Sequence, residues 1–179
     1  MRFGYIHLFQ VVLILYSFTT ISSKLEFTNI KCISHDPEFS DFEYCHLKSV
    51  NRSYKYLSVK VKLYKIPITK IKINFALFKR SNGYKPLLYN ITADACRYLK
   101  NPKSNPVLTY MYGFFKAHSN MNHCCPFDHD LIVDKLTTDF FNTRLTELLP
   151  FPEGEILFKS HWFAYDILRA SASIYFTLS

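Results

Sequence analysis

Glycine is scarce in this sequence, with four residues in a chain of 179. Scarce glycine without any fixed sequence period excludes collagen-like and solenoid architectures. The chain also lacks any block of five or more basic residues, so its formal charge of +8 is spread out and indicates acidic partners only weakly. Hydrophobic residues make up 49% of the chain, which excludes disorder and predicts a substantial core within about one domain.

The common signatures of catalysis are absent as well. The sequence contains no G-x-S-x-G, no H-E-x-x-H, no glycine-rich phosphate loop and no EF-hand calcium loop. We therefore predict a protein that is not an enzyme and that needs no cofactor.

Residues 1–23 have the layout of a secretory signal peptide. A basic start at Arg2 leads into the apolar run 11–15, and small polar residues end the segment. The run is short for an uncleaved anchor, and no second run of about 18 apolar residues follows it. We predict a secreted, extracellular protein with one domain spanning 24–179, no membrane span after cleavage, and no nucleic-acid partner.

Two further features agree with export. Asn51 and Asn90 each begin an N-glycosylation sequon, which predicts that both lie on the surface. All five cysteines follow the leader, where an oxidising compartment favours disulfides: Cys32, Cys45, Cys96, Cys124 and Cys125. Because five is an odd number, one thiol stays free or pairs with another chain.

Alternation of apolar and polar residues dominates the chain from residue 24 onward. It is clear over 59–63, 71–75 and 168–178, and less regular over 25–33, 39–48, 130–136 and 154–163. Such alternation predicts strands with one buried face and one solvated face. About seven such strands favour an antiparallel sandwich over a parallel sheet.

Shorter segments have helical features. Thr92 is placed to cap a helix over 93–99, and Pro106 is placed to open a helix over 107–118. Residues 139–149 fit either a helix or a loop. The predicted fold is mainly β, a two-sheet antiparallel β-sandwich with one to three short helices.

Residues 118–129 hold three histidines and two cysteines. Zinc prefers imidazole and thiolate donors, but the adjacent Cys124 and Cys125 fit poorly at two corners of one tetrahedron. A nucleophile pair of Cys124 and His123 is also disfavoured, because sequence neighbours rarely face each other and extracellular thiols oxidise. We therefore predict no metal site and no catalytic residue.

Four lysines lie in or beside two predicted strands, Lys60 and Lys62 in one and Lys70 and Lys72 at the next. Two interpretations stay open. Lysines on a solvated sheet face discourage edge-to-edge pairing of sheets. Alternatively, the same lysines form a basic rim beside an apolar interior, which suits an anionic headgroup or an acidic glycan.

Seven short fragments occur in a fixed order along the chain: FTNIKC (27–32), CHLK (45–48), LFKRSNGYKP (77–86), YN with DAC (89–96), NP (105–106), SNMNH with CP (119–126) and PFPEG (150–154). As an ordered set they resemble a large insect family of secreted domains of unknown function, expanded in flies. That family is commonly placed beside the ML (lipid-recognition) β-sandwiches.

The resemblance implies an immunoglobulin-like, ML-type sandwich that holds a hydrophobic molecule between its sheets. Cys32, Cys45, Cys96 and Cys125 match the family pattern, whereas Cys124 stands where Ser or Thr is usual and is the expected free thiol. Of the three pairings that four cysteines allow, proximity favours Cys32–Cys45 and Cys96–Cys125.

We therefore expect a secreted binding protein for a small hydrophobic ligand, such as a lipid, a fatty acid or a pheromone, acting in chemosensation or lipid handling. The alternation assigns these residues to the lining of the space between the sheets: Val59, Val61, Leu63, Ile71, Ile73, Phe75, Leu77, Leu168, Ala172, Ile174 and Phe176. The four lysines would form its rim. The alternative is a secreted protein–protein interaction module with a solid core, which binds a cell-surface receptor through a basic face.

Overall fold

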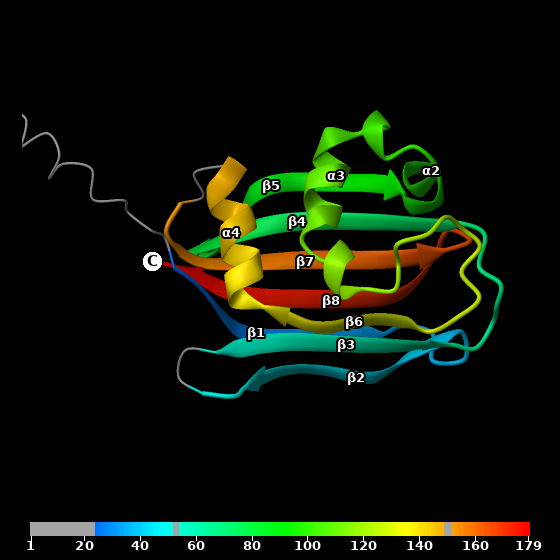
Figure 1. Cartoon of the computed structure of the whole chain (residues 1–179), viewed down its shortest axis with the longest axis horizontal. Helices are drawn as coiled ribbons and strands as arrows, with labels where there is room; N and C mark the ends of the chain where they lie inside the picture. Colours follow the sequence, from blue (N-terminus) through cyan, green and yellow to red (C-terminus); the bar gives the residue numbers. More distant parts are fainter. Residues whose placement is uncertain (1–23, 52–53, 149–151) are drawn as a thin grey trace, which may run out of the picture.

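Two antiparallel β-sheets, one of five strands and one of three, form the framework of the protein (Figure 1). The structure is a computed structural model that describes residues 24–51, 54–148 and 152–179, so the predicted leader lies outside the described residues. The five-stranded sheet has the spatial order β1 (Leu25–Ser34), β8 (Ile167–Leu178), β7 (Gly154–Ala164), β4 (Ile71–Ser81) and β5 (Gly83–Asp94). The three-stranded sheet has the order β2 (Ser40–Ser49), β3 (Lys55–Leu63) and β6 (Leu131–Thr137). The predicted mainly β fold of two antiparallel sheets is confirmed.

Short helices connect the later strands. They are α2 (Ala95–Lys100), α3 (Pro106–Gly113) and α4 (Thr138–Leu148), with 3₁₀ turns at η1 (Pro102–Ser104) and η2 (Lys116–His118). Asp94, rather than Thr92, caps α2, because its carboxylate accepts a hydrogen bond from the Arg97 backbone N–H at 2.8 Å. Thr92 instead lies within β5, where its hydroxyl accepts a hydrogen bond from Asn74. Helix α3 ends at Gly113, five residues before the predicted end.

Strand β5 is the element that the alternation does not predict. Gly83, with a φ of +93°, makes the turn that connects it to β4, and Pro86 lies inside it. Both residue types are typical of turns and loops. Proline is tolerated here because β5 is an edge strand, whose outward backbone groups pair with no further strand of its sheet.

The inner faces of the two sheets meet in one apolar core. Leu57, Val59 and Val61 of β3 belong to the same buried cluster as Phe27 of β1 and Phe176 of β8. Phe114, which follows α3, and Leu145 of α4 belong to this cluster as well. The three-stranded sheet and the two helices therefore form one layer over the inner face of the five-stranded sheet (Figure 1).

Two disulfides fasten this arrangement. Cys32–Cys45 joins β1 of one sheet to β2 of the other, and Cys96–Cys125 joins α2 to the segment before β6. These are the pairs that proximity in the sequence favours, and Cys124 is left as an exposed free thiol. Within the described ranges, no helix has the length and apolar character needed to cross a membrane.

Candidate ligand-binding site

Most of the predicted lining residues share the inner faces of the sheets. The strand register places Leu77 of β4, Phe158 of β7 and Ile174 of β8 in one cross-strand row, and Phe75, Ser160 and Ala172 in the next. Cross-strand partners lie on the same face of a sheet. Six of the predicted residues are buried: Val59, Val61, Phe75, Leu77, Ala172 and Phe176. Leu63, Ile73 and Ile174 are half-buried.

Two predicted lining residues lie elsewhere. Ile71 packs against a second, smaller cluster formed by Phe39, Ile68 and Ala164. Leu168 does not lie on the inner face of the sheet. A register shift after Trp162 pairs Leu168 with Phe163, and Phe163 lies on the outer face because it follows the inward-facing Trp162. Beyond a bulge of this kind, each side chain points to the face opposite to the one that simple alternation predicts. The alternation in the sequence over 168–178 is uninterrupted, so it gives no sign of the bulge.

Four phenylalanines meet at the centre of the core, and of these only Phe176 was predicted as part of the site. The ring of Phe141 in α4 stacks on Phe114 with centroids 4.4 Å apart, and lies 5.4 Å from Phe27 and 5.8 Å from Phe176. We call these four residues the aromatic cluster. Helical segments supply two of its rings, so the interior is closed on this side by short helices and not by strands.

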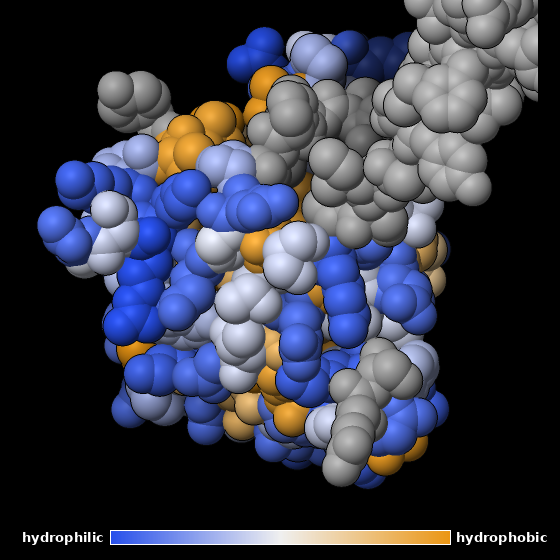
Figure 2. All heavy atoms as spheres, turned by 90° about the vertical axis from the view of Figure 1, so that its left-hand side faces the viewer, coloured by the Kyte–Doolittle hydropathy of each residue, from blue (hydrophilic) through white to orange (hydrophobic). Residues whose placement is uncertain are grey.

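A small hollow opens where β1, β3 and α4 begin, and Leu25 of the apolar core lies in its lining. Its volume is about 50 Å³, and its lining is formed by Lys24, Leu25, Glu26, Lys55, Thr138, Asp139 and Asn142. Small-molecule sites usually have about 300–1,000 Å³, so the hollow holds no acyl chain as it stands. Figure 2 views this end of the sandwich and shows hydrophobic side chains between mainly hydrophilic ones.

The hollow carries a charged pair at its wall. The ammonium group of Lys55 donates a hydrogen bond to the carboxylate of Glu26, and this contact lowers the pKa of Glu26. Lys24 adds a smaller Coulombic contribution in the same direction. Two lysines, Lys24 and Lys55, and two acids, Glu26 and Asp139, therefore line the hollow.

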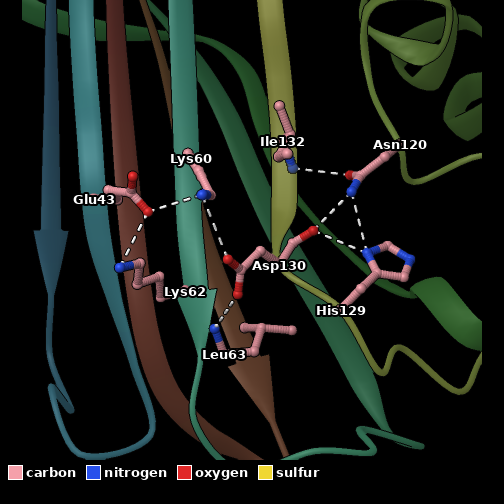
Figure 3. A network of polar contacts seen from close by, with 8 residues as sticks. All are labelled: Glu43, Lys60, Lys62, Leu63, Asn120, His129, Asp130 and Ile132. Carbon is pink, nitrogen blue, oxygen red and sulfur yellow. Dashed lines mark hydrogen bonds and ion pairs between the residues drawn. The ribbon is translucent and has the colours of Figure 1, made fainter.

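The lysines predicted as a rim lie in two separate groups. Lys60 and Lys62 project from β3 of the three-stranded sheet and bind Glu43, at N–O distances of 2.9 and 3.3 Å (Figure 3). Lys60 also lies 3.7 Å from Asp130. The hydrogen bond from Lys60 is the main cause that lowers the pKa of Glu43, and the same bond raises the pKa of Lys60. These charges are already neutralised in part, which weakens the interpretation as a basic binding face.

Lys70 and Lys72 form the second group, beside the five-stranded sheet. Both bind Asp166 in the turn between β7 and β8, with Lys72 at 2.6 Å. Hydrogen bonds from Lys70 first, and then from Lys72, lower the pKa of Asp166 from 3.8 to about 2. The structure thus does not bring the four lysines together around one opening.

The pKa of Asp166 leads to a prediction about acid stability. A carboxylate whose pKa is lower in the folded state stabilises that state above the unfolded pKa, and the contribution disappears as the pH falls to the folded pKa. Asp166→Asn removes the contribution. We expect the variant to melt below the wild type at about pH 6 and the difference in Tm to vanish between about pH 4 and pH 2. Thermal unfolding followed by circular dichroism at stepped pH measures this; a difference that stays constant over the range contradicts it.

The two sequon asparagines are both exposed. Asn51 lies in the turn between β2 and β3, and Asn90 lies in the edge strand β5. Both therefore lie on the surface, as the sequence analysis expects.

Comparison with known families assigns part of the chain. Residues 73–158 match the model of a family described as "Protein of unknown function (DUF1091)". No curated protein sequence matches the chain. The matched segment begins in β4 and ends in β7, so it contains β5, the helices α2, α3 and α4, and the Cys96–Cys125 disulfide. The relation to the ML sandwiches that the resemblance implies stays a prediction.

Proposed function

We propose that the protein is a secreted, glycosylated carrier of a small hydrophobic ligand, which binds between the five-stranded sheet and the layer of α3, α4 and the three-stranded sheet. The observation that carries this proposal is the aromatic cluster, an apolar interior that two short helices close. Strands in a ladder are held by many backbone hydrogen bonds, whereas a short helix is held mainly by packing of its apolar side chains. Displacing α3 or α4 is therefore the easiest way to make room.

The interior supplies enough apolar surface for useful affinity. Burying about twelve methylene groups at ~0.8 kcal/mol each contributes roughly 10 kcal/mol before the costs of association. The aromatic cluster fills the interior, so those costs include moving the rings of Phe114 and Phe141. A flexible acyl chain suits such a site better than a rigid ring system, because it can follow the space that the displaced rings leave.

The hollow at β1, β3 and α4 is the proposed mouth of the site. Lys24 and Lys55 line it, and a carboxylate at the end of an acyl chain would replace Glu26 as the partner of Lys55. This favours a fatty-acid-like ligand with its headgroup at the mouth and its chain toward the aromatic cluster. The ML-type sandwich and a role in chemosensation or lipid handling follow from the resemblance.

Lipid binding itself is tested on protein secreted from insect cells. Native mass spectrometry is expected to find a co-purified lipid, and the stripped protein is expected to take up a fluorescent fatty acid. Protein that is consistently free of ligand and takes up no fatty acid rejects the proposed function and favours the interaction module with a solid core.

The mouth is tested by Lys55→Gln. Loss of one charge-assisted contact of about 1.5 kcal/mol is expected to raise the Kd for a fatty acid roughly tenfold. The Kd for a fatty alcohol of the same length is expected to change little, because it carries no carboxylate. The matched control is Lys85→Gln, on the exposed edge strand β5. Equal effects of the two substitutions on fatty-acid binding would show that the headgroup does not lie at the mouth.

A further inference from the structure

Two histidines of the loop before β6 face each other. The Nε2 atoms of His123 and His129 lie 2.7 Å apart, with ring centroids at 4.9 Å. The sequence argued against a metal site here because two neighbouring cysteines make poor joint ligands. The structure instead brings two imidazoles together, and it engages Cys125 in a disulfide.

The other nitrogen of each ring faces a backbone carbonyl. Nδ1 of His123 lies 2.7 Å from the carbonyl oxygen of Cys124, and Nδ1 of His129 lies 2.9 Å from that of Asp130. A carbonyl oxygen only accepts, so the tautomer that satisfies both carbonyl contacts has its hydrogen on Nδ1 and a bare Nε2 in each neutral ring. Two lone pairs then point at each other, an arrangement that a proton or a metal cation between them stabilises.

Asn120 helps to fix the position of His129. Its side-chain oxygen accepts a hydrogen bond from the Ile132 N–H at 2.8 Å, and its amide nitrogen donates to the Asp130 carbonyl at 2.7 Å (Figure 3). The same amide nitrogen lies 3.1 Å from Nδ1 of His129, a longer contact than that of Nδ1 with the Asp130 carbonyl. The Asp130 carbonyl, which Asn120 holds in place, thus fixes the ring with its Nε2 toward His123.

The loop between the two histidines is anchored on both sides. Phe127 exchanges two backbone hydrogen bonds with Ile68, at 2.8 and 2.9 Å, and its ring lies 4.7 Å from that of His123. The Cys96–Cys125 disulfide ties the same loop to α2. The two imidazoles are therefore held near each other before any ligand arrives.

We propose that His123 and His129 form a binding site for a divalent zinc-type cation, which their Nε2 atoms ligate, with water in the remaining positions. Histidine ligands of metals usually donate their other ring N–H to a backbone carbonyl or a carboxylate, and the Nδ1 atom of each ring here lies within hydrogen-bond distance of a backbone carbonyl. At a Zn–N distance of about 2.1 Å, tetrahedral geometry separates the two nitrogens by roughly 3.4 Å. The Nε2 atoms, now 2.7 Å apart, would therefore move apart by less than about 1 Å to bind the ion. The described residues offer no group of three or more His, Cys, Asp and Glu side chains for a metal, so the site keeps open positions.

Zinc binding is measured on the mature glycoprotein by competition with a chromophoric chelator, using Zn²⁺ alone. We expect binding of one Zn²⁺, and at least tenfold weaker affinity in His123→Gln and in His129→Gln. Asn120→Ala, which removes a positioning residue, is expected to weaken binding about tenfold. The matched control His46→Gln, an exposed histidine of β2, is expected to leave the affinity unchanged.

Two results would overturn the proposal. Cys124→Ser weakening zinc binding as strongly as the histidine substitutions would assign the metal to a thiolate, although the Cys124 Sγ contacts the Leu99 carbonyl at 3.3 Å. Nitrogen NMR spectra showing a proton on one Nε2 that added Zn²⁺ does not displace would assign the pair to an imidazole–imidazole hydrogen bond. Displacement of that proton together with the loss of binding in both histidine variants supports the site. Circular dichroism confirms that each variant is folded.

Discussion

Phe27→Ala is expected to lower the free energy of unfolding by about 4 kcal/mol, the largest effect that we predict for one side chain. Phe27 has an exposed fraction of 0%, and its ring makes an edge contact with Phe141. Truncation removes the buried ring and leaves a cavity. The two sheets and α4 can fill this cavity only in part, because backbone hydrogen bonds between strands and the Cys32–Cys45 disulfide hold the sheets in place. Urea unfolding followed by fluorescence measures the change.

Phe163→Ala is the matched control for this prediction. Phe163 lies in the same five-stranded sheet, on the face away from the core, and is only half-buried. We expect it to cost less than half as much as Phe27→Ala. Equal costs would mean that the centre of the core lies elsewhere. The cavity also bears on function, because it is expected to speed uptake of a fatty acid if the ligand enters the aromatic cluster.

Replacing both cysteines of one disulfide by alanine is expected to have the second-largest effect. The sequence separations are 13 residues for Cys32–Cys45 and 29 for Cys96–Cys125. Loop-closure entropy then gives losses of about 3 and about 3.6 kcal/mol in the free energy of unfolding. The larger loss is expected for Cys96–Cys125, because removing it frees the longer loop in the unfolded chain.

Cys124→Ala provides the control for the disulfide variants. Its thiol is free and exposed, so the expected change in unfolding free energy is close to zero. Urea unfolding of the three variants, each compared with wild type, tests the ranking. A variant without Cys96–Cys125 that is as stable as wild type would show that the loop is already constrained in the unfolded chain.

Only part of the aromatic cluster could be predicted from the sequence. Val59, Val61, Phe75 and Phe176 were assigned to the inner faces because alternation along a strand places side chains on a known side. Phe114 and Phe141 carry no such signal, since a helical or irregular segment can turn its ring toward many neighbours. Only the packing of α3 and α4 onto the sheets brings the two rings together, at 4.4 Å.

For the charged residues, too, the sequence predicts the face of a strand but not the partner of each side chain. Alternation correctly put Lys60 and Lys62 on one side of their strand, where both reach Glu43. It could not say that Lys70 and Lys72 bind Asp166, nearly a hundred residues later, or that Lys55 meets Glu26 at the hollow. Such partners depend on which strands lie next to each other, and the alternation within a single strand does not determine that order.

The sequence by itself determined the class of the fold, two antiparallel sheets with apolar inner faces, because periodicity and burial act residue by residue along the chain. It also supplied the pairing of four cysteines, because the resemblance singled out the four and proximity paired them. The tertiary structure alone decided how the interior is closed, where the hollow with Lys55 and Glu26 lies and that His123 and His129 meet. Contacts between distant segments arise from the packing of whole elements, and a helix or loop can satisfy its own local preferences in many different positions against a sheet.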